Sequence, residues 1–210
     1  GSQTRVDLSF EQDGRVPDAE WKRTIHEAYP ESFPEGEWFP GDFILMTIGQ
    51  GDTLVTPLQL ATAFGALEND GKICVPHVLD RVVAPDETLV REYQQNCRRR
   101  VRIDERHLRY VRDALTGTVT GGGTAGAAFA GFPFDAVWVA GKTGTAEVDP
   151  KQDYSWFAAM TAAGGQEHVV VALVEQGGHG ATTAAPIVRH IIEGIYGLEF
   201  SQFTDIEGTD

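Results

Sequence analysis

The sequence predicts an α+β protein in which helices pack on an antiparallel β-sheet. Three apolar, strand-like runs lie close together at residues 136–140, 156–162 and 169–175. Short turns connect them, and short turns join antiparallel strands because a parallel pair needs a longer crossover. Helical patterns precede and follow these runs instead of alternating with them, which is typical of the α+β class.

The composition is that of one globular domain with an acidic surface. Of the 210 residues, 41% are hydrophobic and 23% are charged, so the chain can bury a core. The formal net charge of -14 argues against nucleic-acid binding, which requires a basic face. The six histidines are scattered and the two cysteines lie far apart, so we expect no metal site.

We divide the chain into three segments. Residues 1–43 are rich in Pro, Gly and aromatic residues, so we expect an irregular, loop-rich segment of the same domain. A short helix at residues 18–29 is the exception, with Asp18 as its N-cap. Residues 44–198 hold the periodic elements, and residues 199–210 are expected to form a flexible tail.

The main segment is expected to begin with a helix over residues 56–67. Thr56 is a suitable N-cap, and Pro57 fits the first helical turn. The turn-forming residues Asn-Asp-Gly at 69–71 end this helix. A β-branched strand follows over residues 73–83, and we expect it to pair with residues 88–94.

The expected strand contains one of the two cysteines. Cys74 lies in its apolar part and is expected to be a small core residue. A single disulfide with Cys97 remains an alternative if the protein lies in an oxidising compartment. The basic run at residues 98–102 is expected to be a solvated loop or the exposed face of an edge strand.

Two further helices enclose the strand-rich region. Asp104 can cap the first of them. Its apolar face has helical spacing and consists of Leu108, Val111, Leu115 and Val119. Residues 120–126 contain four glycines and are expected to form a flexible loop, without the Gly-Lys-Ser/Thr ending of a phosphate-binding loop. The last helix is expected over residues 183–196, with Pro186 in its first turn and Gly197 beyond its end.

The residues that can carry chemistry follow the first apolar strand and read Lys142-Thr143-Gly144-Thr145. Lys142 supplies a positive charge, and both threonines supply hydroxyl donors. Gly144 allows a ligand to approach the backbone closely. Such a strand edge suits an anion or a carbonyl group, and a backbone N–H there can stabilise a developing oxyanion. Because the triplet Lys-Thr-Gly is short, a turn with a solvated lysine is the alternative interpretation.

The triplet and the stretches around it resemble one protein family. Lys-Thr-Gly is the third signature of penicillin-binding proteins and class A β-lactamases. Further matching stretches occur in the family's order, at residues 14–18, 21–22, 49–52, 55–61, 71–72, 75–78, 175–180 and 184–187. Together they resemble the elongation-type subgroup of class B penicillin-binding proteins. The resemblance implies the C-terminal part of a penicillin-binding transpeptidase domain, with its serine β-lactamase-like fold.

The resemblance also implies an activity and its site. The family's enzymes are D,D-transpeptidases that cross-link peptidoglycan outside the cytoplasm through a serine acyl-enzyme. By analogy, Lys142 and the hydroxyl of Thr143 bind the substrate carboxylate, and the backbone N–H of Thr145 belongs to the oxyanion hole. The Thr145 hydroxyl can also contact a ligand, and Gly144 keeps the strand edge clear.

The same resemblance implies the surroundings of the protein. The expected partners are peptidoglycan stem peptides, β-lactams, the upstream half of the same domain and other cell-wall synthesis proteins. No cofactor is expected, because acyl transfer of this kind uses side chains and backbone donors alone. We expect the protein on the extracytoplasmic side of the membrane, anchored by a segment absent from this chain.

The chain departs from the family pattern because it lacks the serine motifs. The family requires Ser-x-x-Lys for nucleophile and base and Ser-x-Asn for proton transfer, and both lie upstream of where this chain begins. No serine of this chain starts either motif; the serines are Ser2, Ser9, Ser32, Ser155 and Ser201. A nucleophile needs an activating base, so we expect the chain alone to be inactive. Two alternatives remain open: a β-lactamase or β-lactam sensor domain, and a non-catalytic binding or scaffold module.

Overall fold

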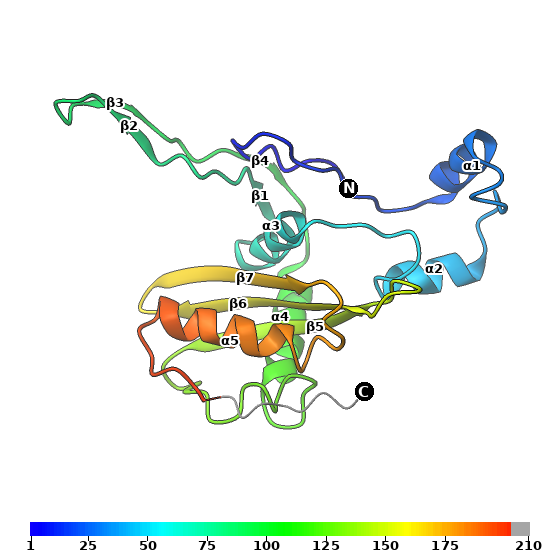
Figure 1. Ribbon diagram of the computed structural model, residues 1–210. Coiled ribbons are helices and arrows are strands. Elements are labelled where there is room, and N and C mark those ends of the chain that lie inside the picture. The colour runs from blue at the N-terminus through cyan, green and yellow to red at the C-terminus, as the bar shows by residue number, and fades with distance from the viewer. Residues whose placement is uncertain (203–210) are drawn as a thin grey trace.

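A three-stranded antiparallel sheet forms the centre of the protein. The computed structural model describes residues 1–202, apart from the side chain of Arg98. The strands β5 (Trp138–Ala146), β6 (Tyr154–Ala163) and β7 (Gln166–Val174) lie in the order β5-β6-β7 (Figure 1). Every neighbouring pair in this sheet is antiparallel. The predicted α+β class and the antiparallel arrangement are therefore confirmed, and β5 is an edge strand among the described residues.

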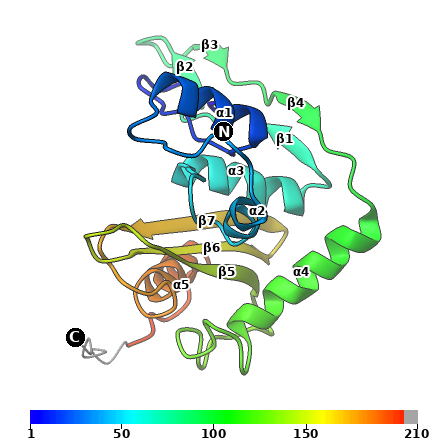
Figure 2. The same cartoon turned by 90° about the vertical axis from the view of Figure 1, so that its right-hand side faces the viewer.

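Helices cover both faces of this sheet. Helix α5 (Ala184–Ile195) and helix α3 (Pro57–Glu68) both pack on β6 and β7, and they lie on opposite sides (Figure 2). Helix α4 (Glu105–Val119) runs alongside β5. The main core lies between the sheet and α5. It contains Val139, Phe157, Ala159, Val188 and Ile192, all of them 0% exposed. Helices therefore hold the sheet from both faces, and α4 holds the β5 edge in place.

The predicted helix caps are confirmed. Asp18 precedes α1 (Ala19–Ala28) and accepts a hydrogen bond from the backbone N–H of Trp21 at 2.7 Å. Thr56 and Gln59 form a reciprocal capping box at the start of α3, which satisfies two otherwise unpaired donors. Asp104 accepts from the backbone N–H of Arg106 at 2.9 Å and caps α4.

One helix was not predicted. Helix α2 (Pro40–Thr47) begins at a proline, which suits the first turn because that position needs no N–H donor. Asp42 accepts a hydrogen bond from the backbone N–H of Phe39 at 2.7 Å and forms an ion pair with Lys22 at 2.6 Å. This helix runs across the expected boundary between residues 43 and 44, and that division of the chain remains a prediction.

The expected flexible tail is docked where the structure describes it. The backbone N–H of Ser201 donates to the carboxylate of Glu193 at 3.0 Å, and its carbonyl oxygen accepts from His190 at 2.8 Å. Residues 203–210, the remainder of the expected tail, lie outside the described residues.

The prediction of one strand over residues 73–83 was wrong. The structure has two short strands there, β1 (Lys72–Cys74) and β2 (Arg81–Val83), separated by a segment that contains Pro76. Proline has no N–H for a β-ladder and interrupts the strand. Strand β2 pairs with β3 (Leu89–Glu92), as expected, and the two project as a hairpin away from the sheet (Figure 1).

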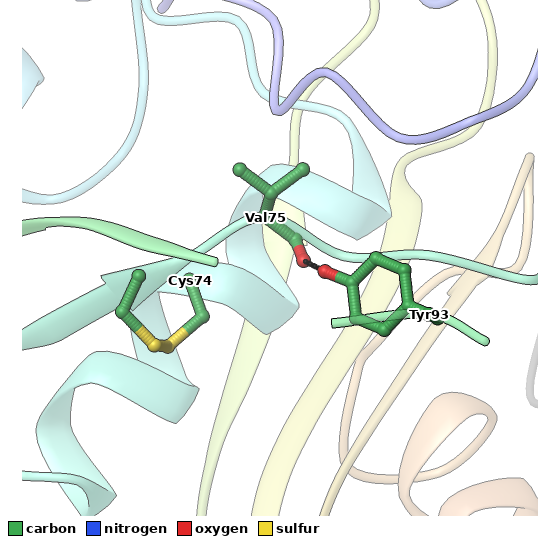
Figure 3. The surroundings of a disulfide bond; sticks show 4 residues. Cys74, Val75 and Tyr93 are labelled. Atoms are coloured by element: carbon green, nitrogen blue, oxygen red, sulfur yellow. Dashed lines mark hydrogen bonds between the residues drawn. A yellow bond between two sulfur atoms is a disulfide. The ribbon is translucent and has the colours of Figure 1, made fainter. Parts of the chain in front are cut away.

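The expectation that Cys74 is a free core residue was also wrong. Strand β1 pairs with β4 (Cys97–Arg100), and this pairing places Cys74 opposite Cys97, with which it forms a disulfide (Figure 3). The hydroxyl of Tyr93 donates to the carbonyl oxygen of Val75 at 3.1 Å beside the disulfide. Both links close the base of the segment that leads into the β2–β3 hairpin.

Candidate active site

The predicted site residues lie on the free edge of β5. Lys142 to Thr145 occupy the second half of this strand, whose other side is paired with β6. In an antiparallel ladder the N–H and C=O of one residue point to the same side, and successive residues alternate. Side-chain contacts identify the outward-facing set: the ammonium of Lys142 donates to the Thr143 carbonyl at 2.7 Å, and the Gln50 amide donates to the Thr145 carbonyl at 3.3 Å.

The backbone N–H groups of Thr143 and Thr145 therefore also face the free edge. Gly144, between them, pairs with Trp156 of β6 and turns its backbone groups inward. The backbone N–H of Thr145 is thus available on the free edge of β5, and its role as an oxyanion donor stays a prediction. The edge thus combines two outward donors with an exposed ammonium group, a combination that suits a peptide carbonyl together with an anion.

The hydroxyl of Thr143 has a partner that sequence analysis missed. The Oγ1 atoms of Thr143 and Thr124 are 3.0 Å apart. Thr124 belongs to the Gly-rich segment 120–126, which was expected to be a flexible loop. In the structure this segment is a compact series of turns in which Ala125 is completely buried. No pattern in the sequence connects Thr124 with the triplet.

The hydroxyl of Thr145 is covered by the turn before α5. The backbone N–H of Gly180 donates to the Thr145 Oγ1 at 3.4 Å. A Cβ atom on Gly180 would lie only 2.4 Å from the carbonyl oxygens of Gly144 and Trp156. Only glycine therefore allows this turn to lie so close to the paired strands β5 and β6.

Gly144 itself faces an aromatic side chain. A Cβ atom at this position would lie 3.0 Å from the Cβ of Trp156, its partner on β6. The absence of a side chain thus accommodates Trp156 on the face of the sheet. The role assigned to Gly144 from the sequence, leaving the strand edge clear for a ligand, stays a prediction.

Gln50 completes the edge from a distant part of the chain. Its side-chain amide donates to the Thr145 carbonyl and accepts from the backbone N–H of Glu147 at 3.4 Å. It therefore pairs with the end of β5 as a neighbouring strand would. Gly49 and Gly51 flank it with φ values of 76° and 67°, a left-handed conformation that favours glycine. The Gly-Gln-Gly sequence was the available signal for this residue.

Ser155 has a structural role. It is completely buried, its hydroxyl donates to the His179 carbonyl at 3.1 Å, and it accepts from the backbone N–H of Ala184 at 3.0 Å. These bonds tie the start of α5 to β6. Among the described residues, no group of three or more His, Cys, Asp or Glu side chains is arranged to hold a metal ion. Within the same residues, no helix has the length and apolar character to cross a membrane.

A helix-covered antiparallel sheet with Lys-Thr-Gly-Thr on its free edge is the arrangement expected from the resemblance to penicillin-binding proteins. The chain belongs to the penicillin binding protein transpeptidase domain family, whose family model matches residues 1–193.

Relatives with established names agree with this membership. The chain is 28% identical over 211 residues to the peptidoglycan D,D-transpeptidase MrdA of Salmonella typhimurium, covering 93% of this chain and 32% of that protein. It is 31% identical over 161 residues to the peptidoglycan D,D-transpeptidase PbpA of Mycolicibacterium smegmatis, covering 70% of this chain and 30% of that protein. The chain thus spans about a third of the length of these curated relatives.

Solved structures show the same similarity. PBP2 of Pseudomonas aeruginosa in complex with WCK 5153 is 28% identical, with a TM-score of 0.72. The match covers 97% of this chain and 43% of the PBP2 chain. Penicillin-binding protein A of M. tuberculosis, as an imipenem acyl-enzyme complex, is 26% identical with a TM-score of 0.64, covering 75% of this chain and 34% of that one. These matches confirm the predicted fold and the resemblance to elongation-type class B proteins.

Proposed function

We propose that this chain supplies the substrate-binding wall of a peptidoglycan D,D-transpeptidase. The observation that carries the proposal is the free edge of β5, where Thr143 and Thr145 turn their backbone groups outward beside the ammonium of Lys142. An extended stem peptide can add to such an edge as a further strand. Its terminal carboxylate would then lie against Lys142 and the Thr143 hydroxyl.

The proposed reaction has two acyl-transfer steps. A serine hydroxyl attacks the carbonyl carbon of the penultimate D-Ala, forms an ester with it and releases the terminal D-Ala as an amine. An amine of a neighbouring stem peptide then attacks the ester, forms a new amide and regenerates the serine. The backbone N–H of Thr145 would stabilise the oxyanion of each tetrahedral intermediate, a contribution that is often the largest single one in acyl transfer.

The nucleophile must come from a polypeptide segment outside these 210 residues. None of the chain's serines begins a Ser-x-x-Lys or Ser-x-Asn sequence, and Ser155, the serine nearest the triplet, is buried and hydrogen-bonded. We propose that a segment with both motifs packs against this chain and that the chain alone is inactive, since an unactivated hydroxyl is a weak nucleophile.

The disulfide supports an extracytoplasmic location. Disulfides such as Cys74–Cys97 persist in oxidising compartments and are rare in the reducing cytosol. A peptidoglycan transpeptidase acts outside the cytoplasm, so the location and the proposed activity agree. In this proposal, a membrane anchor and contacts with other cell-wall synthesis proteins belong to segments beyond this chain.

Covalent labelling with a fluorescent penicillin tests the proposed function. In membranes of the source organism, the labelled polypeptide should yield tryptic peptides from this chain. The variant Lys142→Ala should acylate about 10- to 100-fold more slowly, because a hydrogen bond to a charged group contributes about 1.5–3 kcal/mol. Lys72→Ala, which changes an exposed lysine of β1, is the control and should label at the wild-type rate.

Three outcomes would contradict the proposal in different ways. If no labelled polypeptide contains these residues, the chain is not part of a penicillin-reactive enzyme, and a binding or scaffold module takes its place. If the label is released rapidly as hydrolysed penicillin, the enzyme is a β-lactamase. Equal acylation rates for the Lys142 variant and the Lys72 control would remove Lys142 from the site.

A further inference from the structure

We propose that Thr124 is a positioning residue that orients the hydroxyl of Thr143 toward the carboxylate of the ligand. This inference rests on the proposed function, in which Thr143 binds that carboxylate. Thr124 lies outside the Lys-Thr-Gly-Thr motif and comes from the segment between α4 and β5. The carrying observation is the 3.0 Å contact between the two hydroxyl oxygens.

The hydrogen-bonding capacity of the two hydroxyl groups explains how Thr124 sets the direction of the Thr143 hydrogen. Each hydroxyl has one hydrogen to donate and two lone pairs to accept with. When Thr124 donates to Thr143, the hydrogen of Thr143 is free to point away toward the edge of β5. A carboxylate only accepts hydrogen bonds, so it favours this arrangement over the reverse one. The Lys142 ammonium, which is bonded to the Thr143 carbonyl at 2.7 Å, adds positive charge at the same place.

The segment around Thr124 is built to hold it in position. On one side, a Cβ atom on Gly123 would lie 2.1 Å from the Gly117 carbonyl oxygen, so this close approach to α4 requires glycine. On the other side, the backbone N–H of Ala125 donates to the Thr118 carbonyl at 2.9 Å, and Ala125 is completely buried. The backbone of Thr124 is thus anchored at both ends while its side chain remains exposed.

Three substitutions separate positioning from stability. Thr124→Val removes the hydroxyl and keeps the shape, while Thr124→Ser keeps the hydroxyl. Thr120→Val is the matched control, because Thr120 lies in the same segment but its hydroxyl donates to the Thr116 carbonyl of α4 at 3.2 Å. Each variant is made in the complete enzyme that the penicillin-labelling experiment identifies, and it is purified without label. Acylation rates are measured with a penicillin and with its methyl ester, which lacks the negative charge.

Thr124→Val should lower the acylation rate with the penicillin about tenfold and leave the rate with the ester nearly unchanged, the size expected for one hydrogen bond. Thr124→Ser should keep the faster acylation by the free acid than by the methyl ester, because the hydroxyl is retained. Thr120→Val should keep it as well. Equal losses with acid and ester, or the same loss in Thr120→Val, would overturn the positioning role. A wild-type enzyme that takes no label overturns the proposed function, and this inference with it.

Discussion

At the scale of single residues, an ion pair inside α5 links three segments of the chain. Arg189 donates to the carboxylate of Glu193 at 2.7 Å, and both side chains are at least nine-tenths buried. The guanidinium also donates to the carbonyl oxygen of Ala128 at 2.8 Å, in the segment that leads to β5. The other carboxylate oxygen of Glu193 accepts from Ser201. The pair therefore joins the helix to the approach of β5 and to the residues that follow α5.

This ion pair predicts a pH dependence of stability. Burial alone would raise the pKa of Glu193, but hydrogen bonds from Ser201 and Arg189 outweigh it and hold the pKa below its ordinary value. A depressed pKa in the folded state contributes stability above the unfolded value of about 4.3. That contribution is lost as the pH falls through the lower, folded-state pKa.

Glu193→Gln should lower the free energy of unfolding by about 3 kcal/mol at pH 7, because it removes the carboxylate charge from a buried, hydrogen-bonded ion pair with Arg189. The difference from the wild type should shrink as the pH falls below about 4. Urea denaturation between pH 7 and pH 3 measures both effects. The control is Glu105→Gln, since Glu105 forms an ion pair with Arg109 at the same spacing but exposed to solvent. A constant difference at all pH values would contradict the assignment to Glu193.

At the scale of elements, the turn before α5 decides how closely two parts of the site approach. Gly180→Ala should destabilise the protein by about 2 kcal/mol, because its Cβ would meet the carbonyl oxygens of Gly144 and Trp156. It should also weaken the contact of the turn with the Thr145 hydroxyl and slow acylation. Gly117→Ala in α4 is the control: it points into open space, and alanine should stabilise the helix by about 1 kcal/mol. Urea denaturation that ranks Gly180→Ala level with the wild type would show that the turn can move.

Periodicity predicted those elements whose apolar pattern is long and regular. Helices α3, α4 and α5 and strand β6 were found because their apolar residues form a pattern over many residues. Strand β5 was predicted only to residue 140, although it continues to Ala146. Its second half lies on a free edge and carries Lys and Thr, so apolar alternation cannot reveal it. Helix α2 was missed because Pro40 and Gly41 were interpreted as breakers.

The site could be predicted in part for a similar reason. Lys142 to Thr145 are adjacent in the sequence, so their chemistry forms a recognisable motif. Gln50 lies 95 residues from the carbonyl it contacts, and Thr124 lies 19 residues from Thr143. Contacts over such separations arise from the packing of elements, and no local periodicity encodes them. The disulfide belongs to the same group, because it follows from the pairing of β1 with β4.

At the scale of the whole molecule, the sheet covers only part of the apolar side of α5. The part that includes Val188 and Ile192 is completely buried against the sheet. The adjoining part carries Ile187, Ile191 and Ile195 at a spacing of four residues, and all three are exposed among the described residues. A contiguous exposed apolar patch often marks a contact with another polypeptide segment. This exposed face of α5 therefore agrees with the proposal that the segment with the serine motifs packs against this chain.

This arrangement predicts opposite effects in the isolated chain and in the complete enzyme. Changing Ile187 and Ile191 together to Gln should reduce the binding of an apolar fluorescent dye to the 210-residue chain, since it removes part of an exposed patch. In the complete enzyme the same change should lower the free energy of unfolding by about 3 kcal/mol, because two large side chains would lose their burial. Tyr110→Gln, at an isolated position that is 75% exposed, should have little effect on either quantity. A complete enzyme that tolerates both glutamines without loss of stability would show that this face of α5 remains in solvent and that the serine-bearing segment packs elsewhere.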